Sequence, residues 1–112
     1  MKLLPNFQSA IIPIEKLRDY CLSEEHADGK HKAIVFKSQL GLLAKDAEWL
    51  KEKIAEAITS NNAITRLEDD YGKRFHLDFK LKVNMKTATV RTAWIIRTSE
   101  TEPRLTSCYI IS

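Results

Sequence analysis

The sequence predicts an α+β fold in which N-terminal helices pack on one face of a four-stranded antiparallel β-sheet, connected as a meander. Up to about residue 60, apolar residues recur at the spacing of helices, and from about residue 63 they alternate with polar residues as in strands. Short turn signals separate the alternating runs. Helices followed by such a run of strands are typical of the α+β class.

Three helices are predicted before the sheet. The first begins at Pro13 and covers IEKLRDYCLS, because proline suits the first helical position. The second is KHKAIVFKSQLG, with Asp28 as its candidate N-cap and Gly41 as its stop. Its predicted buried face consists of Ala33, Phe36 and Leu40.

The third predicted helix, DAEWLKEKIAEAITSNN, has the clearest amphipathic pattern and ends at Asn61 and Asn62. Its apolar stripe consists of Leu50, Ile54, Ala57 and Ile58. Four strands follow: residues 64–68, residues 74–83 after a turn at 70–72, TATVRTAWIIR, and RLTSCYIIS after Pro103.

The size and composition predict one domain over residues 1–112, with a helical part at about 13–60 and a sheet part at about 63–112. The chain is 44% hydrophobic and 29% charged, which is typical of a soluble protein, and no apolar run is long enough to cross a bilayer. MKLLPNF breaks too soon for a secretory signal, so we expect a cytoplasmic protein without membrane contact. Cys21 and Cys108 lack metal-ligand spacing and are predicted to be buried, and no cofactor is expected.

The open face of the predicted sheet is basic. In the second strand, the apolar residues Phe75, Leu77, Phe79, Leu81 and Val83 alternate with His76, Asp78, Lys80 and Lys82. If the apolar residues face the helices, the exposed surface carries His76, Lys80, Lys82, Arg91 and Arg97. This surface either binds a polyanion, which the net charge of +3 permits, or is an ordinary solvated face.

Arg91 lies in the middle of the third strand, where a guanidinium is held rigidly and suits a phosphate group. The alternative is that Arg91 pairs with Asp78 on the neighbouring strand. A second candidate anion site is the start of the second helix, where backbone amides point outward near Lys30 and Lys32. There is no glycine-rich phosphate loop, nucleophile elbow or metal-ligand cluster. Acid–base chemistry on a phosphodiester without a metal is therefore the enzymatic option that these residues permit.

Several segments resemble a bacterial domain-of-unknown-function family, numbered sixty-eight eighty-three. They are LPNFQSAIIPIEKLRDYCLSEEHADGKHKAIVF, YGKRFHLDF, ATVRTAWII and PRLTSCYII. The resemblance extends over nearly the whole chain, and some members of the family form the last module of large polymorphic toxins. Two positions depart from the family pattern: Ala27 replaces a proline after His26, and Ser107 replaces a threonine.

The order of elements is also similar to that of the barnase, EndoU, colicin and RelE group of ribonucleases, which is a likeness of fold alone. Together the two resemblances imply that His26 or His31 transfers a proton and that Lys32 and Arg91 stabilise phosphate charge. Thr92, Ser107 and Tyr109 would orient the substrate or donate hydrogen bonds. Thr92 conflicts with this role because it shares a strand side with Trp94, which is predicted to face the core.

Two functions follow as hypotheses. The first is a metal-independent ribonuclease or toxin-like RNA-cleaving domain. Its candidate catalytic residues are His26, His31, Lys32, Arg91, Ser107 and Tyr109. The second is a non-catalytic interaction module, of the immunity or regulatory type, that binds an acidic partner or nucleic acid through the basic sheet face. The expected partners are RNA and a cognate immunity or antitoxin protein.

Overall fold

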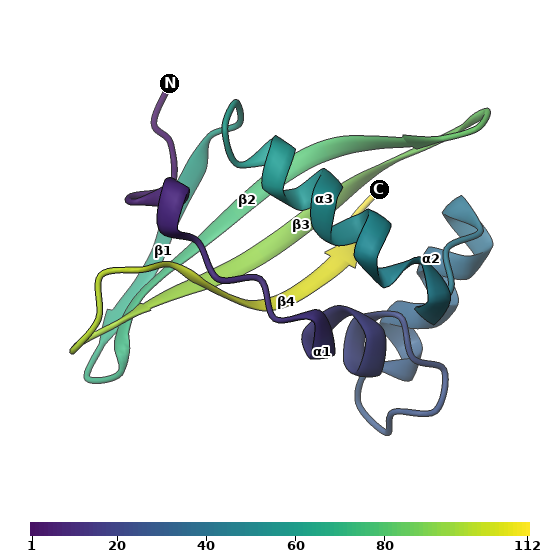
Figure 1. Ribbon diagram of the computed structural model, residues 1–112, viewed down its shortest axis with the longest axis horizontal. Helices are drawn as coiled ribbons and strands as arrows, with labels where there is room; N and C mark the ends of the chain where they lie inside the picture. Colours follow the sequence, from purple (N-terminus) through teal and green to yellow (C-terminus); the bar gives the residue numbers. More distant parts are fainter.

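Four antiparallel strands form one sheet in the order β1-β2-β3-β4, so that each strand lies beside the next one in the chain (Figure 1). The computed structural model describes all residues, 1–112. The strands are β1 (Ala63–Asp69), β2 (Gly72–Val83), β3 (Lys86–Arg97) and β4 (Arg104–Ile110). The predicted α+β class, with helices before an antiparallel meander, is confirmed.

The helices are shorter and more varied than the sequence pattern predicts. They are α1 (Ile14–Lys16), the π-helical turn η2 (Leu17–Cys21), α2 (Lys30–Leu40) and α3 (Ala47–Ala57), with 3-10 turns η1 (Phe7–Ser9) and η3 (Ala44–Asp46). Pro13 precedes α1 instead of forming its first residue, because its backbone is extended, with ψ at 124°. No helix is both long enough and apolar enough to cross a membrane.

The predicted buried faces of α2 and α3 are confirmed. All of the predicted residues are buried: Ala33, Phe36 and Leu40 in α2, and Leu50, Ile54, Ala57 and Ile58 in or directly after α3. Gly41 ends α2 in the left-handed conformation, with φ at +70°, where glycine is favoured. The third helix ends at Ala57, before the predicted residues Asn61 and Asn62. The Asn61 side chain donates to the Ala57 carbonyl at 2.9 Å and so satisfies the last carbonyl of the helix.

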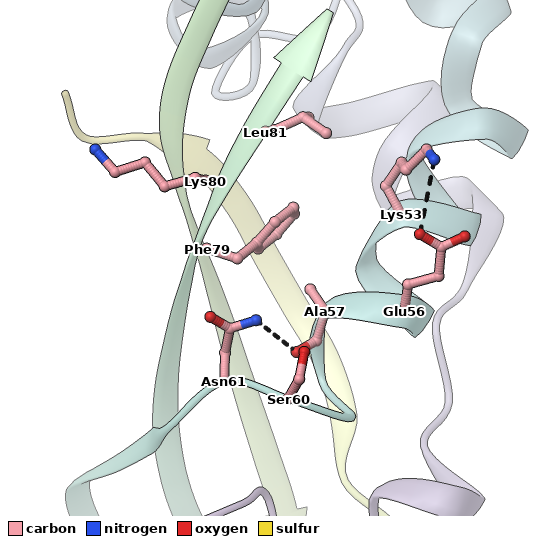
Figure 2. Close-up of a pocket in the computed structure, with 8 residues that line it drawn as sticks. All are labelled: Lys53, Glu56, Ala57, Ser60, Asn61, Phe79, Lys80 and Leu81. Atoms are coloured by element: carbon pink, nitrogen blue, oxygen red, sulfur yellow. Dashed lines mark hydrogen bonds and ion pairs between the residues drawn. The ribbon is translucent and has the colours of Figure 1, made fainter. Parts of the chain in front are cut away.

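Helix α3 crosses one face of the sheet (Figure 1). Beside its C-terminal half, a shallow pocket of about 350 Å³ lies between the helix and β2 (Figure 2). The side chains of Phe79 and Leu81 point from β2 toward α3, whereas Lys80 points away from it (Figure 2). This arrangement matches the alternation predicted for the second strand.

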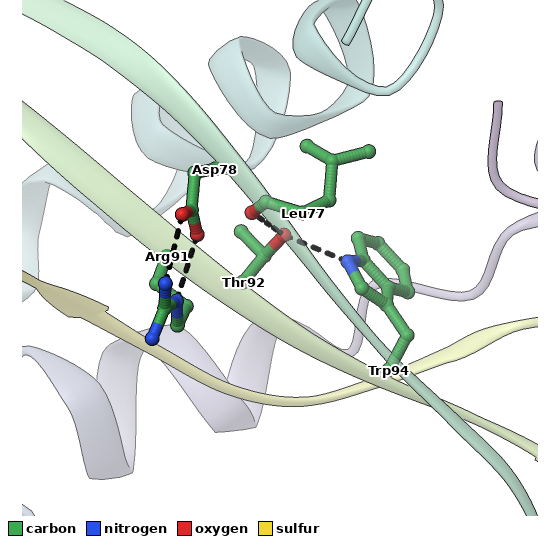
Figure 3. Close-up of polar contacts among 5 residues, drawn as sticks. All are labelled: Leu77, Asp78, Arg91, Thr92 and Trp94. Carbon is green, nitrogen blue, oxygen red and sulfur yellow. Dashed lines mark hydrogen bonds and ion pairs between the residues drawn. The ribbon is translucent and has the colours of Figure 1, made fainter. Parts of the chain in front are cut away.

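The core between the helices and the sheet contains one buried polar chain of contacts. The indole nitrogen of Trp94 donates to the Thr92 hydroxyl at 2.7 Å, and this hydroxyl donates to the Leu77 carbonyl at 2.8 Å (Figure 3). Both Thr92 and Trp94 are almost completely inaccessible to solvent. Thr92 is therefore a core residue, and its hydroxyl has a structural role instead of pointing toward a substrate.

The outer edge of β4 is covered by a segment that the sequence pattern does not reveal. Ile11 forms a parallel bridge with Arg104: its amide donates to the Pro103 carbonyl at 2.8 Å, and its carbonyl accepts from the Leu105 amide at 2.9 Å. Because an exposed edge strand is prone to pair with other chains, this contact protects the start of β4. It also brings the N-terminal helices to the same edge of the sheet.

Candidate active site

The loop before α2 is organised by His26. Its Nδ1 atom accepts hydrogen bonds from the backbone amides of Asp28 at 3.0 Å and Gly29 at 2.9 Å. The lone pair of Nδ1 is therefore directed at the loop backbone, which leaves Nε2 as the ring nitrogen that is not engaged by the loop. The prediction of Asp28 as N-cap is wrong: the N-cap residue is Gly29, and no side chain caps the helix. The Lys30 amide instead donates to the His26 carbonyl at 3.0 Å.

His26 and Gly29 hold this loop against Tyr20. The rings of His26 and Tyr20 meet edge to face, with centroids 4.8 Å apart and planes at 78°. A β-carbon at Gly29 would collide with the Tyr20 carbonyl, so only glycine permits this approach. The loop therefore fixes η2, which carries Tyr20, beside the start of α2.

Lys32 reaches from the first turn of α2 to two tyrosines. Its ammonium nitrogen donates to the Tyr20 hydroxyl at 2.7 Å and lies 4.7 Å from the centre of that ring. The same nitrogen lies 5.8 Å from the centre of the Tyr109 ring, which comes from β4. A half-buried cation between two phenol rings is held in place by a hydrogen bond and by cation–π attraction.

Arg91 is linked to this cluster through Tyr109. The register between β3 and β4 places the two residues opposite each other. The guanidinium of Arg91 binds both oxygens of Asp78, at 2.8 Å and 3.0 Å (Figure 3). The hydrogen bond and charge of Asp78, and more weakly those of Tyr109, raise the pKa of Arg91 above its ordinary value. The cross-strand pairing that the sequence left as an alternative is therefore present.

A pocket of about 430 Å³ lies where α2 meets the end of β4. Its lining residues are His31, Lys32, Val35, Tyr109 and Ile110. Three of the predicted site residues, His31, Lys32 and Tyr109, are thus gathered around one cavity. Arg91 lies opposite Tyr109 on the neighbouring strand, whereas His26 is engaged with the loop backbone and does not line the pocket.

Ser107 stands apart from the pocket. Its hydroxyl oxygen is buried without a nitrogen or oxygen partner, and the Cys21 thiol is its neighbour. Cys21 and Cys108 are both buried and free, as predicted. Burial raises the pKa of the Cys21 thiol and also that of the Cys108 thiol, so neither thiol is an activated nucleophile.

Tyr20 is the site residue that sequence reasoning missed. It lies on a π-helical turn, and its contact with Lys32 joins residues that no regular spacing relates. The only signal for it was its place in the family pattern, within KLRDYCL. The contact needs the loop of His26 and Gly29 to fold back, which periodicity does not describe.

The exposed face of the sheet carries the predicted basic residues. Lys80, Lys82 and Arg97 are exposed, and His76 and Arg91 are half-buried. This face also exposes Ile64 and Leu67 of β1, each to about half of its surface. The basic face is therefore interrupted by apolar side chains at the β1 edge.

The pairing of Asp78 with Arg91 predicts a modest loss of stability when it is broken. Asp78→Ala is expected to lower the free energy of unfolding by about 1 kcal/mol, because the pair is bidentate but each side chain keeps about 30% of its surface in solvent. Urea unfolding measures this change. Asp19→Ala is the matched control, since Asp19 pairs with Arg18 at the same 2.8 Å but is 57% exposed, and its removal should have no measurable effect. Equal effects of both variants would contradict the prediction.

His76 predicts a loss of stability in acid. Burial lowers the pKa of His76 from its ordinary value of 6.5, and the charges of Arg91 and Arg66 lower it further. The unfolded chain thus binds the proton more readily than the folded chain. The free energy of unfolding is therefore unaffected by protonation of His76 above pH 6.5, and it declines as the pH falls from 6.5 through the pKa of His76 in the folded state. His76→Gln should reduce the loss of urea-unfolding free energy between neutral pH and about pH 5. An unchanged loss in the variant would contradict this assignment.

Comparisons with known proteins identify the family of the chain. No curated protein and no solved structure matches it. The family resemblance of the segments around Tyr20, Lys32, Arg91 and Tyr109 is confirmed, since one family model covers almost all of the sequence. That model, described as Domain of unknown function (DUF6883), matches residues 3–112, and the chain belongs to this family.

Proposed function

We propose that the pocket between α2 and β4 is the active site of a metal-independent, toxin-like RNA-cleaving domain. The observation that carries the proposal is the position of Lys32, whose ammonium lies between Tyr20 and Tyr109 at the wall of a pocket that His31 also lines. Arg91 adds a second cation behind Tyr109. A cation at the pocket wall and a second one beside the Tyr109 that lines it suit a phosphodiester, whose charge increases at the transition state.

The reaction assigned to this pocket is attack of an RNA 2′-hydroxyl on the adjacent phosphorus. A base removes the 2′-hydroxyl proton, the bond to the 5′-oxygen breaks, and an acid donates a proton to that oxygen. The products are a 2′,3′-cyclic phosphate and a 5′-hydroxyl. His31 is the preferred proton-transfer group because it lines the pocket, whereas the Nδ1 atom of His26 is occupied by the loop amides.

Lys32 and Arg91 would stabilise the charge on the phosphate oxygens, a task that bound metal ions perform in metal-dependent nucleases. The Tyr109 phenol would orient the phosphate between the two cations. Asp78 would act as a positioning residue, because its bidentate contact fixes the plane of the Arg91 guanidinium. Ser107 would contribute only indirectly, since its buried hydroxyl does not line the pocket.

The test is cleavage of labelled single-stranded RNA in excess EDTA, with the product ends identified. The purified protein should yield cyclic phosphate ends, and DNA, which lacks the 2′-hydroxyl, should remain intact. Arg91→Ala should lose this activity, and the double variant Asp78→Ala/Arg91→Ala should lose it as well without leaving an unpaired carboxylate. RNA that stays intact with the unmodified protein, or full activity in both variants, would overturn the proposal.

A second function is favoured by a different observation, the open sheet face with its exposed Lys80, Lys82 and Arg97. On this hypothesis the chain is a non-catalytic interaction module, of the immunity or regulatory type, that binds nucleic acid or an acidic partner through this face. The same RNA separates the two hypotheses. Binding without cleavage that is lost in Lys82→Glu but kept in Lys32→Ala would favour the sheet face, and cleavage that depends on Lys32 would favour the pocket.

A further inference from the structure

The second half of β2 pairs with a strand on one side only, so its other edge is free. β1 begins at Ala63, opposite Leu77, so it pairs only with residues 72–77 of β2. Residues 78–83 pair with β3 alone, as one arm of a hairpin whose turn is Asn84 and Met85. The other side of this arm has no neighbouring strand.

The hairpin geometry identifies which backbone groups are free. In a two-residue hairpin the residues that flank the turn, here Val83 and Lys86, exchange backbone hydrogen bonds, and the bonded pairs then alternate along the ladder. Leu81 and Phe79 therefore bond to β3. The amides and carbonyls of Lys80 and Lys82 point toward the free side, where an added strand would find them.

The pocket beside α3 lies along this free edge (Figure 2). Its sheet wall consists of Phe79, Lys80 and Leu81, and its helix wall runs from Lys53 to Asn61. The last carbonyl of the helix, at Ala57, already accepts from the Asn61 side chain, and Lys53 is paired with Glu56 at 3.6 Å. The helix wall is thus satisfied, whereas the backbone of the sheet wall is open.

We propose that an extended acidic peptide from a partner protein adds to this edge of β2, in line with β1. Side chains of an added strand alternate between the two sides of the sheet. Those on the helix side would enter the pocket over Phe79 and Ala57, which suits small apolar residues. Those on the open side would lie beside Lys80 and Lys82, which suits glutamate or aspartate.

The charges disfavour a second copy of this chain as the occupant. Antiparallel pairing of two β2 edges centred on Leu81 would bring Lys80 and Lys82 against the same lysines of the other copy, and like charges directly opposite each other are destabilising. A register centred on Lys80 would set Lys82 opposite Asp78, but that carboxylate is already held by Arg91. An acidic strand turns the same lysines into attractive partners. This surface is separate from the pocket at Lys32, so the proposal does not depend on RNA cleavage.

The first experiment titrates isotope-labelled protein with a short blocked peptide in which glutamate and valine alternate. The Lys80 and Lys82 amides should shift in NMR spectra and become protected from hydrogen exchange. The Leu81 amide is already bonded to β3 and should change little. A peptide N-methylated at the residues that bond to β2 should bind at least about tenfold more weakly, because it lacks the required donors, whereas methylation at the intervening residues should be tolerated.

The second experiment reverses the charges. Lys80→Glu/Lys82→Glu should weaken binding of the glutamate–valine peptide by about tenfold or more and should create binding of the matching lysine–valine peptide. Lys30→Glu/Lys45→Glu, which changes the net charge equally at exposed helix and turn positions, should leave the affinity within about twofold. The proposal is overturned if the Lys80 and Lys82 amides stay unprotected at the highest peptide concentration, or if both double variants bind alike.

Discussion

Lys32→Met is expected to lower the rate of RNA cleavage by about 100- to 1,000-fold, the loss typical when one group that stabilises transition-state charge is removed. Methionine keeps the length and the apolar stem of the side chain, so the Tyr20 and Tyr109 rings retain a packing neighbour. Only the ammonium and its 2.7 Å hydrogen bond to Tyr20 are lost. The measurement is single-turnover cleavage of single-stranded RNA in EDTA.

Lys30→Met is the matched control, because Lys30 lies two residues earlier on the same helix, is exposed and contacts neither tyrosine. It removes the same charge from the same turn and should cleave RNA at nearly the full rate. The urea midpoints of both variants show whether the fold is kept. An unimpaired rate in Lys32→Met, or an equal loss in Lys30→Met, would contradict the role given to Lys32.

The sheet could be predicted well because its long central strands, β2 and β3, carry an alternating pattern that is visible over a short stretch of sequence. In β2 the residues from Phe75 to Leu81 alternate strictly between buried and accessible positions, and this period fixes both the strand and its buried face. The connection at residues 84–86 follows from its position between two such runs, and the structure narrows the turn itself to Asn84 and Met85. The buried stripe of α3 is equally local, since Leu50 and Ile54 are one helical turn apart.

The candidate site could be predicted only in part, because its contacts join distant segments. The segment KHKA gives a basic helix start, but nothing in it shows that Lys32 reaches Tyr20 or that His26 caps the loop. For Arg91 the sequence offered two roles, and only the strand register decides that Asp78 lies opposite it. The Ile11 bridge to β4 is missed for the same reason, as a single pairing has no periodicity.

Thr92→Val is expected to lower the free energy of unfolding by about 2 kcal/mol, although valine has nearly the same shape as threonine. The Thr92 hydroxyl accepts from the Trp94 indole at 2.7 Å and donates to the Leu77 carbonyl at 2.8 Å (Figure 3). Without it, the indole N–H is buried with no acceptor, because both residues are almost fully inaccessible. A buried donor without a partner costs more than the hydrogen bond itself contributes.

Thr92→Ser separates the hydroxyl from the methyl group. Serine keeps both hydrogen bonds and should lose only the contribution of one buried methyl, about 1 kcal/mol. In Thr92→Val/Trp94→Phe the unpaired indole is removed as well, so the double variant should be more stable than the sum of the two single losses predicts. Urea midpoints at unchanged slope measure all five proteins: the unmodified chain, Thr92→Val, Thr92→Ser, Trp94→Phe and the double variant. If Thr92→Val matches the unmodified protein, or if the two losses simply add, the hydroxyl does not hold Trp94 in the core, and Thr92 becomes available again as a functional residue.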